Sequence, residues 1–255
     1  MRNKMKLLKL LSAALVLSCS TQAQAAPLTV AVAANVKYAF DDLAAEFRKD
    51  TGIEVQGVFS SSGKIAAQVK SGAPYDVFVS ADTETPEALF KDGWAATKPR
   101  IYAHGVLVLW TMKDIDLNKG LPLLTEAGVQ KVSIANPKVA PYGRAAIQAL
   151  ESAKIKEAVE PKLVYGESIA QAAQFVESGA ADIGFNAKSV VISSEMSGKG
   201  KWVEVNQGSY EPITQAVVVL KHGAETQAEA SRKFVDFLFT PKARAIFEKY
   251  GYLLP

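Results

Sequence analysis

The sequence predicts an α/β protein built from two sheets. Short apolar segments rich in β-branched residues alternate with amphipathic segments from residue 28 onward. This βαβα order is typical of mostly parallel sheets with helices on both faces. The number of strand-like segments suits two small sheets better than one large sheet, so we expect a protein with two lobes.

Nine short runs are predicted strands because each is apolar and bounded by Gly, Pro or polar clusters. They cover residues 28–34, 54–59, 76–81, 105–110, 132–136, 162–166, 182–187, 202–205 and 213–220. Amphipathic segments between them are predicted helices. In the first one, Phe40, Leu43 and Phe47 recur at helical spacing, and Gly52 ends the segment. Residues 230–251 form the last predicted helix, which Pro241 breaks or restarts.

We expect the chain to cross between the lobes twice. Residues 26–103 together with 215–255 are assigned to the first lobe, and residues 104–214 to the second. Two crossing segments would act as a hinge, with a ligand cleft between the lobes.

Residues 1–25 have the pattern of a cleavable signal peptide. Four basic residues precede the uncharged apolar run Leu10–Leu17, and Ala23-Gln24-Ala25 follows as a small-x-small cleavage site. The apolar run is too short to span a bilayer. Cys19 follows Val-Leu-Ser and weakly suggests a lipoprotein site, but the Ala-Gln-Ala site fits better. We therefore expect a soluble exported protein.

Charge and cysteine content exclude several classes of function. Four of the 29 basic residues and none of the 26 acidic residues lie in residues 1–25, which leaves 25 basic and 26 acidic residues in the mature chain. This balance gives no support for nucleic acid as a partner. Cys19 is the only cysteine, so the mature chain lacks disulfides, zinc-thiolate sites and cysteine nucleophiles.

The segment VFSSSGKIAAQ (58–68) places three serines and a glycine before a predicted helix. It is not a phosphate loop of the G-x-x-x-x-G-K-[ST] type. Five residues separate Gly57 from Gly63, and Ile65 replaces the required hydroxyl. The N–H groups at a helix start can nevertheless hold an anion, and serine adds a hydroxyl donor. Alternatively, Ser61 or Ser62 is only an N-cap.

The same arrangement occurs at three other predicted helix starts. Asn35 follows the first strand, Pro141-Tyr142-Gly143 precedes another helix, and Glu167-Ser168-Ile169 precedes a further one. Ligands of open α/β sheets bind outside the carboxyl ends of the strands, where such helix starts gather. Each expected lobe holds two of the four, so they can face each other across a cleft.

Five blocks carry a family resemblance over nearly all of the mature chain. They are LTVAVAANVKYAFDDLAAEF, VFSSSGKIAAQVKSGAPYDVFVSAD, VAPYGRAAIQALE, GESIAQAAQFVESGAADIGF and ARAIFEKYGYLLP. With them the sequence resembles the periplasmic molybdate-binding proteins of ATP-binding-cassette importers. The resemblance implies a type II-like periplasmic binding protein that is not an enzyme. It also implies a monomer that captures molybdate, and tungstate as well, and delivers it to a membrane permease without a cofactor.

Neutral hydrogen-bond donors hold the oxyanion in that family. Matched by position, the resemblance implies Asn35, Ser62, Tyr142 and the backbone N–H of Ile169 as ligands, with no direct cation ligand. Ala187 stands where some members have a tyrosine ligand, whereas others have that tyrosine in the Pro-Tyr-Gly loop, as here. Asn35 stands where some members have serine, and its amide can also donate.

A site made only of donors suits molybdate and tungstate, because these dianions carry no proton at neutral pH. Selectivity against sulfate must then depend on cavity size, and a receptor for another tetrahedral oxyanion such as sulfate is the first alternative. We expect Glu167, which would repel a dianion, to face solvent. Arg144 is expected to be a solvated cation near the Tyr142 loop, and Asp82 a helix cap.

A remote alternative is an exported hydrolase that uses one of the serines at 60–62 as nucleophile. Such an enzyme needs a base, and only His104, His222 or a lysine such as Lys64 is available. The chain has no Gly-x-Ser-x-Gly motif, and the two histidines do not have zinc-site spacing.

Overall fold

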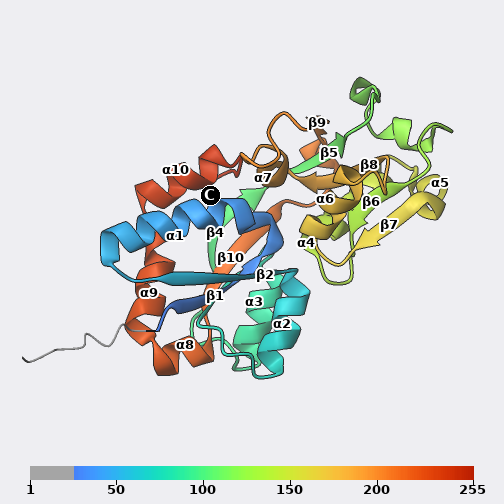
Figure 1. The fold of residues 1–255 in the computed structure, drawn as a ribbon. Coiled ribbons are helices and arrows are strands. Elements are labelled where there is room, and N and C mark those ends of the chain that lie inside the picture. Colours follow the sequence, from blue (N-terminus) through green and yellow to red (C-terminus); the bar gives the residue numbers. More distant parts are fainter. Residues whose placement is uncertain (1–25) are drawn as a thin grey trace, which may run out of the picture.

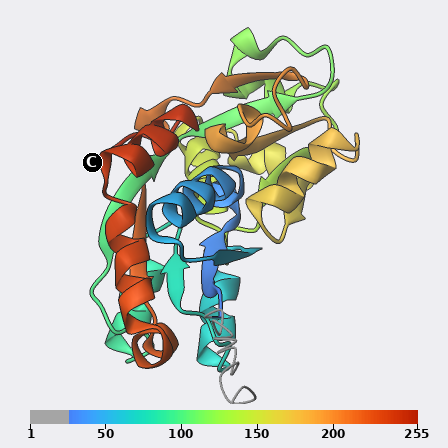
Figure 2. The same ribbon diagram turned by 60° about the vertical axis from the view of Figure 1, so that its left-hand side comes forward.

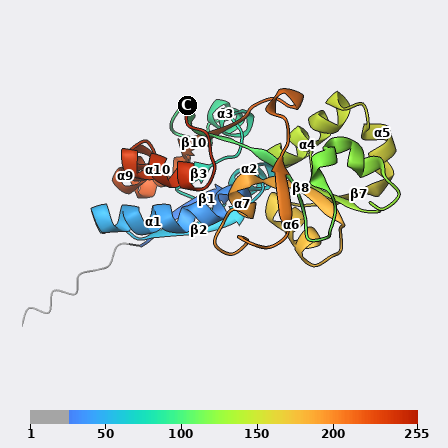
Figure 3. The same ribbon diagram turned by 90° about the horizontal axis from the view of Figure 1, so that it is seen from above.

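The structure is a computed structural model that describes residues 26–255. Two five-stranded sheets form two lobes (Figure 1), which lie side by side when seen from above in Figure 3. We call the lobe with the C-terminal helices the first lobe. The predicted signal peptide, residues 1–25, lies outside the described residues.

The first sheet has the strand order β2-β1-β3-β10-β4. Strand β1 runs parallel to β2 and β3, whereas β10 runs antiparallel to β3 and β4. The strands are β1 (Leu28–Ala33), β2 (Val55–Ser60), β3 (Val77–Val79), β4 (Arg100–Gly105) and β10 (Ile213–Val219).

The second sheet repeats this plan with the order β7-β6-β8-β5-β9. Strand β6 is parallel to β7 and β8, and β5 is antiparallel to β8 and β9. The strands are β5 (Leu107–Thr111), β6 (Val132–Ala135), β7 (Leu163–Gly166), β8 (Ile183–Ala187) and β9 (Lys201–Glu204). The predicted fold class is confirmed, with the difference that each sheet also carries two antiparallel pairings.

The chain passes from the first sheet to the second at Val106 and returns between Glu204 and Ile213. The predicted lobe boundaries, after residues 103 and 214, therefore fall inside strands β4 and β10 of the first sheet. The division of the chain into lobes at those residues stays a prediction.

Ten α-helices flank the sheets within residues 26–255, and none is long and apolar enough to cross a bilayer. The first lobe has α1 (Lys37–Thr51), α2 (Ser62–Lys70), α3 (Glu84–Lys91), α8 (Lys221–Thr226), α9 (Ala228–Phe237) and α10 (Pro241–Lys249). The second has α4 (Pro141–Ser152), α5 (Lys156–Val159), α6 (Ile169–Glu177) and α7 (Lys188–Val191). A single 3₁₀ turn, η1 (Ala34–Val36), joins β1 to α1.

The helix boundaries follow from local sequence. Gly52 ends α1 with a φ of 74°, a left-handed conformation that glycine adopts without strain. Pro241 starts α10, and the Thr240 hydroxyl caps that helix by accepting from the N–H of Ala243 at 3.3 Å. The alternative that Pro241 restarts the C-terminal helix is therefore confirmed.

Alternate residues of the first sheet point into two separate cores. Val30 and Val32 of β1 pack under α1, α9 and α10, whereas Ala31 packs under α2 and α3. The same alternation occurs in β3 and β10, so this sheet is buried on both faces. In Figure 2 the C-terminal helices lie beside α1, where the Phe47 ring contacts the rings of Phe234 and Phe237.

Strand β4 is the one strand that the sequence did not predict. It is an edge strand whose only neighbouring strand is β10, apart from an isolated bridge between His104 and Leu253, and its residues Arg100 and Ile101 are exposed. The run RIYAHG therefore lacks the apolar pattern of a buried strand. Its buried residue Tyr102 nevertheless belongs to the network around the site described below.

Replacing Phe47 with alanine should lower the free energy of unfolding by about 3 to 5 kcal/mol, because the ring is fully buried between α1 and α9. Chemical denaturation measures this loss. Phe59→Ala serves as the matched control, since that ring is 37% exposed and should give a much smaller loss. Equal losses for the two variants would contradict the packing described here.

Candidate functional site

A small cavity lies between the two lobes. Its walls come from the end of β1 and η1, from the start of α2 and from Ala81 in the first lobe, and from the starts of α4 and α6 in the second. The lining residues are Ala33, Ala34, Asn35, Ser61, Ser62, Ala81, Ala140, Pro141, Tyr142 and Ile169. All four ligand residues expected from the sequence are among these ten.

The cavity has room for one small ligand. Its free volume is only about 10 Å³, so a large organic molecule does not fit.

Three α-helices and one 3₁₀ turn start at this cavity. Helix α2 starts at Ser62, α4 at Pro141 and α6 at Ile169, while η1 starts at Ala34 and runs directly into α1. The N–H groups of a first turn have no acceptor within their own helix, and the aligned peptide dipoles make this end of a helix positive. The cavity can therefore stabilise negative charge without a basic side chain.

Ser62 is held with its oxygen as an acceptor. Its Oγ accepts the N–H of Ala81 at 3.0 Å and lies 3.1 Å from the hydroxyl of Ser80. The Ser80 hydroxyl is also 2.9 Å from Oδ1 of Asp82, a charged and therefore stronger acceptor. When the Ser80 hydroxyl donates its hydrogen bond to Asp82, the Ser62 hydroxyl can donate its own to a ligand in the cavity.

Tyr142 is oriented in a similar way by Gln215. The Gln215 Nε2 donates to the Tyr142 oxygen at 3.3 Å, while its Oε1 accepts from Tyr102 at 2.7 Å and from Asn35 Nδ2 at 3.0 Å. The Tyr142 proton is therefore free to point into the cavity. Burial, with a smaller contribution from Tyr252, raises the pKa of Tyr142 well above its ordinary value. The phenol thus stays a donor at neutral and mildly alkaline pH.

Asn35 lines the cavity, but both hydrogens of its side-chain amide are bound within the protein. Its Nδ2 donates to Oε1 of Gln215 and to the Tyr252 hydroxyl, each at 3.0 Å. The backbone carbonyl oxygen of Asn35 accepts hydrogen bonds from the hydroxyls of Tyr252 and Ser189, each at 2.8 Å. In this arrangement the side-chain amide expected to donate to a ligand instead connects three distant segments of the chain.

Ile169 occupies the first position of α6 and is buried. The neighbouring Ser168 caps the helix, with its Oγ accepting the N–H of Gln171 at 3.3 Å. The N–H of Ile169 is thus left for a group in the cavity. Glu167 faces solvent, as the sequence predicts, and its side chain is 68% exposed where it pairs with Lys64 of α2.

Three residues around the site were not predicted from the sequence. Gln215 is a lone glutamine within the apolar run ITQAVVVL, and this was the only signal for it. Ser80 and Tyr252 gave no signal, because their roles depend on neighbours far away in the chain. Ser61 was considered as a cap or as a nucleophile and not as a ligand, and its side chain makes no capping hydrogen bond.

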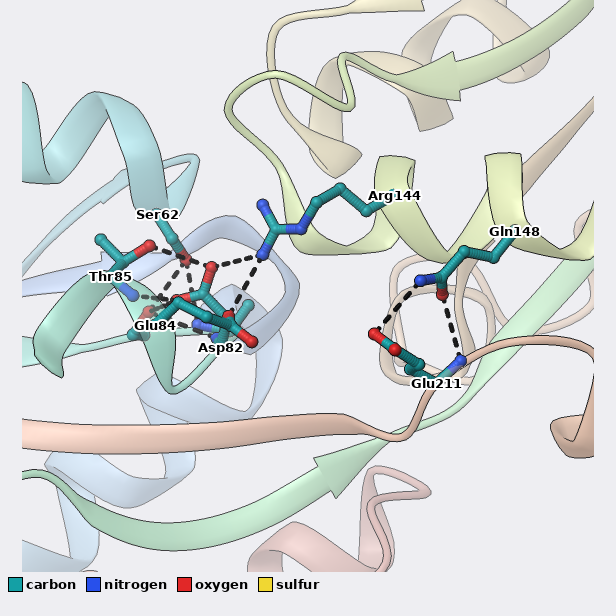
Figure 4. Close-up of polar contacts among 9 residues, drawn as sticks. Ser62, Asp82, Glu84, Thr85, Arg144, Gln148 and Glu211 are labelled. Atoms are coloured by element: carbon teal, nitrogen blue, oxygen red, sulfur yellow. Dashed lines mark hydrogen bonds and ion pairs between the residues drawn. The ribbon is translucent and has the colours of Figure 1, made fainter. Parts of the chain in front are cut away.

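Charged side chains surround the cavity without lining it. Asp82 of the first lobe is buried, and its Oδ2 accepts from Nη2 of Arg144 in the second lobe at 2.7 Å (Figure 4). Asp82 also caps α3 by accepting the N–H of Thr85 at 3.2 Å, as predicted. Arg144 also lies 3.4 Å from Glu84, and its side chain is 42% exposed, so it is a solvated cation as expected from the sequence and is ion-paired as well.

The two lobes also contact each other directly near the cavity. The N–H of Gly63 in the first lobe donates to the carbonyl of Val139 in the second at 3.0 Å, beside the Lys64–Glu167 ion pair. A Cβ on residue 63 would lie only 3.0 Å from Cα of Val139, so glycine permits this approach. The structure therefore represents a closed arrangement of the two lobes.

None of the bases considered for a serine hydrolase lines the cavity. Nδ1 of His104 is 3.1 Å from Oγ1 of Thr214, and Nδ1 of His222 is 2.9 Å from Oδ1 of Asp76. Lys64 is paired with Glu167. The ten lining residues, all within the described part of the chain, have no charged side chain, and residues 26–255 contain no cluster of His, Cys, Asp or Glu suited to a metal ion.

Tyr252→Phe should lower the free energy of unfolding by about 1 to 3 kcal/mol, because Asn35 then loses a buried donor and a buried acceptor. Urea denaturation of the ligand-free protein measures the loss. In the control Tyr165→Phe the hydroxyl lies on a side chain that is 46% exposed, so stability should change by less than about 0.5 kcal/mol. A loss no larger than the control's would contradict this network.

Comparison with known proteins identifies the family to which the chain is related. Residues 28–253 match the family described as bacterial extracellular solute-binding protein. The chain is 43% identical over 238 residues to the molybdate-binding protein ModA of Azotobacter vinelandii, with 92% of each chain covered. It is 41% identical over 242 residues to that of Rhodobacter capsulatus, covering 94% of this chain and 93% of the relative.

A solved structure has the same architecture. The periplasmic molybdate-binding protein of Azotobacter vinelandii superposes with a TM-score of 0.83 and 37% identity, over 89% of this chain and 99% of that one. Proteins of this family bind solutes and are not enzymes, which removes the hydrolase alternative. The resemblance seen in the sequence is confirmed, and the chain belongs to the bacterial extracellular solute-binding protein family.

Proposed function

We propose that the protein binds molybdate, and tungstate as well, in the cavity between its lobes and delivers it to an ABC importer. The observation that carries this proposal is the closed cavity itself, which has helix starts and hydroxyl groups in its wall but no charged side chain. The names of its relatives at 43% and 41% identity support molybdate as the ligand.

The chemistry of the wall favours an unprotonated oxyanion. The hydroxyls of Ser62 and Tyr142 have their oxygens occupied by N–H donors, so each can offer its proton to the ligand. Backbone N–H groups at the starts of α2, α4 and α6 add further donors. A ligand that carries a proton of its own, such as hydrogen phosphate, would need an acceptor in place of one of these donors. Ser62, Tyr142, Ile169 and the backbone of Asn35 are the proposed ligand residues.

Sulfate is the second candidate because it has the same charge and shape. Donors alone do not separate it from molybdate, so the discrimination must come from the fit of the larger anion to the cavity walls. Four of the ten lining residues are alanine and one is proline, and these short side chains do not adjust in the way that longer side chains do.

We propose that the two lobes open and close on the ligand by a hinge at the two crossings. The crossings at Val106 and between Glu204 and Ile213 support this. On closure, α4 and α6 of the second lobe join η1 and α2 of the first around the anion.

The proposed function also includes export of the chain to the periplasm and delivery of the bound anion to the importer. Residues 1–25 would direct the chain to the periplasm and be removed there. The closed, ligand-bound monomer would then dock on the membrane permease of the importer. The family's description as extracellular supports this location.

Calorimetry on residues 26–255 should show binding of molybdate and of tungstate, with sulfate binding more weakly and phosphate not at all. The donor groups and the cavity size give the reason for this order. Competition between sulfate and tungstate separates the two candidate ligands. Binding of sulfate or phosphate without any response to molybdate would rule out the proposal.

Ser62→Ala should weaken molybdate binding by about 1.5 to 3 kcal/mol, because it removes one hydrogen bond to a charged ligand. Titration calorimetry measures the change. Ser71→Ala, at the C-cap of α2, is the control, since the Ser71 hydroxyl is exposed and donates only to the carbonyl of Ala67. If the two variants bind equally well, Ser62 has only a structural role.

Arg144→Gln should weaken molybdate binding roughly 5- to 150-fold, the effect of about 1 to 3 kcal/mol. Arg144 and Asp82 lie in different lobes, so their ion pair forms only on closure, and without it Asp82 remains buried and unpaired near the anion. Arg100→Gln is the control, because Arg100 pairs with Asp236 within the first lobe. An unchanged affinity for Arg144→Gln would show that this pair does not contribute to closure.

A further inference from the structure

We infer that Ser61 is a further ligand of the oxyanion, and that its hydroxyl donates a hydrogen bond which adds to the one from Ser62. This inference rests on the proposed function and identifies an additional determinant within the same site. Ser61 was not among the residues that the family resemblance implied.

The hydroxyl of Ser61 is buried and has no hydrogen-bond partner within residues 26–255. The residue is only 4% exposed, and its Oγ is without a donor or acceptor. Ser61 stands at the N-cap position of α2 with extended backbone angles, φ −72° and ψ 151°, which usually accompany a capping serine. Its side chain nevertheless does not cap the helix. Helix capping therefore does not explain the serine at this position.

Location distinguishes Ser61 from the other buried groups without partners. The part of the chain that the structure describes has three such side-chain atoms, Oγ of Ser61, Nδ2 of Asn186 and Oγ of Ser231. Among these three residues, only Ser61 lines the cavity. Buried polar groups in folded proteins are almost always paired. A ligand in the cavity would provide the missing partner.

The surroundings of Ser61 determine which kind of ligand can do this. The Ser62 hydroxyl, whose oxygen already accepts the N–H of Ala81, and the free first-turn N–H groups of the helices that start at the cavity are all hydrogen-bond donors. A group that fits among them must offer several acceptors in a small volume, which is the chemistry of a tetrahedral oxyanion. Ser61 can then only donate, since its oxygen would otherwise face an anionic oxygen. Two adjacent hydroxyls of one loop thus bind the side of the anion that faces the first lobe.

Ser61→Ala and Ser231→Ala form a matched pair of variants. Each removes one buried hydroxyl that has no partner in the protein, but only Ser61 lines the cavity. Neither variant should lower the melting temperature of the ligand-free protein, because an unpaired buried hydroxyl does not stabilise the fold. Ser61→Ala should weaken molybdate binding roughly 10- to 150-fold, the loss of one hydrogen bond to a charged group. Ser231→Ala should bind like the wild type.

The outcomes separate this inference from the proposed function. If the wild type binds neither molybdate nor tungstate, the proposed function fails. If the wild type binds and Ser61→Ala binds equally well, only the role of Ser61 is overturned. A large loss of stability in ligand-free Ser61→Ala would also overturn it, because the hydroxyl would then have a structural role.

A crystal of the wild-type protein with tungstate provides a test that does not depend on any variant. The anomalous signal of tungsten locates the anion. A distance of about 2.5 to 3.0 Å between Oγ of Ser61 and a tungstate oxygen supports the inference. A hydroxyl turned away from the anion, or bound only to water, contradicts it.

Discussion

The hydrogen bonds of Gln215 connect the parts of the site that lie farthest apart in the chain. This side chain is fully buried in β10, at a point where the pairing of β10 with β4 shifts register. Its two ends contact Asn35 and Tyr102 of the first lobe and Tyr142 of the second. A buried amide with partners on both ends orients its neighbours, since rotating it would leave polar groups unpaired. The direction of the Tyr142 proton, and the position of the first loop, depend on this residue.

Because the oxygens of Ser62 and Tyr142 each accept from an N–H group, the protons of these two hydroxyls are available to the cavity. The backbone N–H of Ala81 donates to the Ser62 oxygen, and Nε2 of Gln215 donates to the Tyr142 oxygen. The resulting wall is neutral but strongly polarised, and it can stabilise a dianion through dipoles. Lysine or arginine in the wall would add attraction but would also have to be desolvated on closure. Dipoles of the folded backbone are already oriented before the ligand arrives.

The charges nearest the site occur as pairs that join the two lobes. Lys64 with Glu167 and Arg144 with Asp82 each combine one residue from each lobe. Each pair links the two lobes and therefore favours the closed arrangement. The N–H of Gly63 in α2 also donates to the carbonyl of Val139, which brings the backbones of the two lobes into direct contact. The contacts that hold the lobes together thus lie next to the residues that line the cavity.

The sequence alone determined the α/β class, nine of the ten strands, the helix stop at Gly52 and the restart at Pro241. It also pointed to the four helix starts around Asn35, Ser62, Tyr142 and Ile169. These features depend on hydrophobic periodicity and on residues with strong local preferences, which are visible in one stretch of chain. Strand β4 escaped prediction because an edge strand exposes one face and has no continuous apolar run.

Only the tertiary structure decided which donors are free. Asn35 was expected to offer its amide to the ligand, but that amide binds Gln215 and Tyr252, which lie 180 and 217 positions further along the chain. Arg144 is partly exposed, as expected, but its pairing with Asp82, 62 positions away, was not foreseen. An N-cap role was one alternative for Ser61 or Ser62, yet the Ser61 hydroxyl makes no capping bond and stays unpaired in the cavity wall. Hydrogen-bond partners depend on which segments the fold brings together, and local sequence contains no record of those distances.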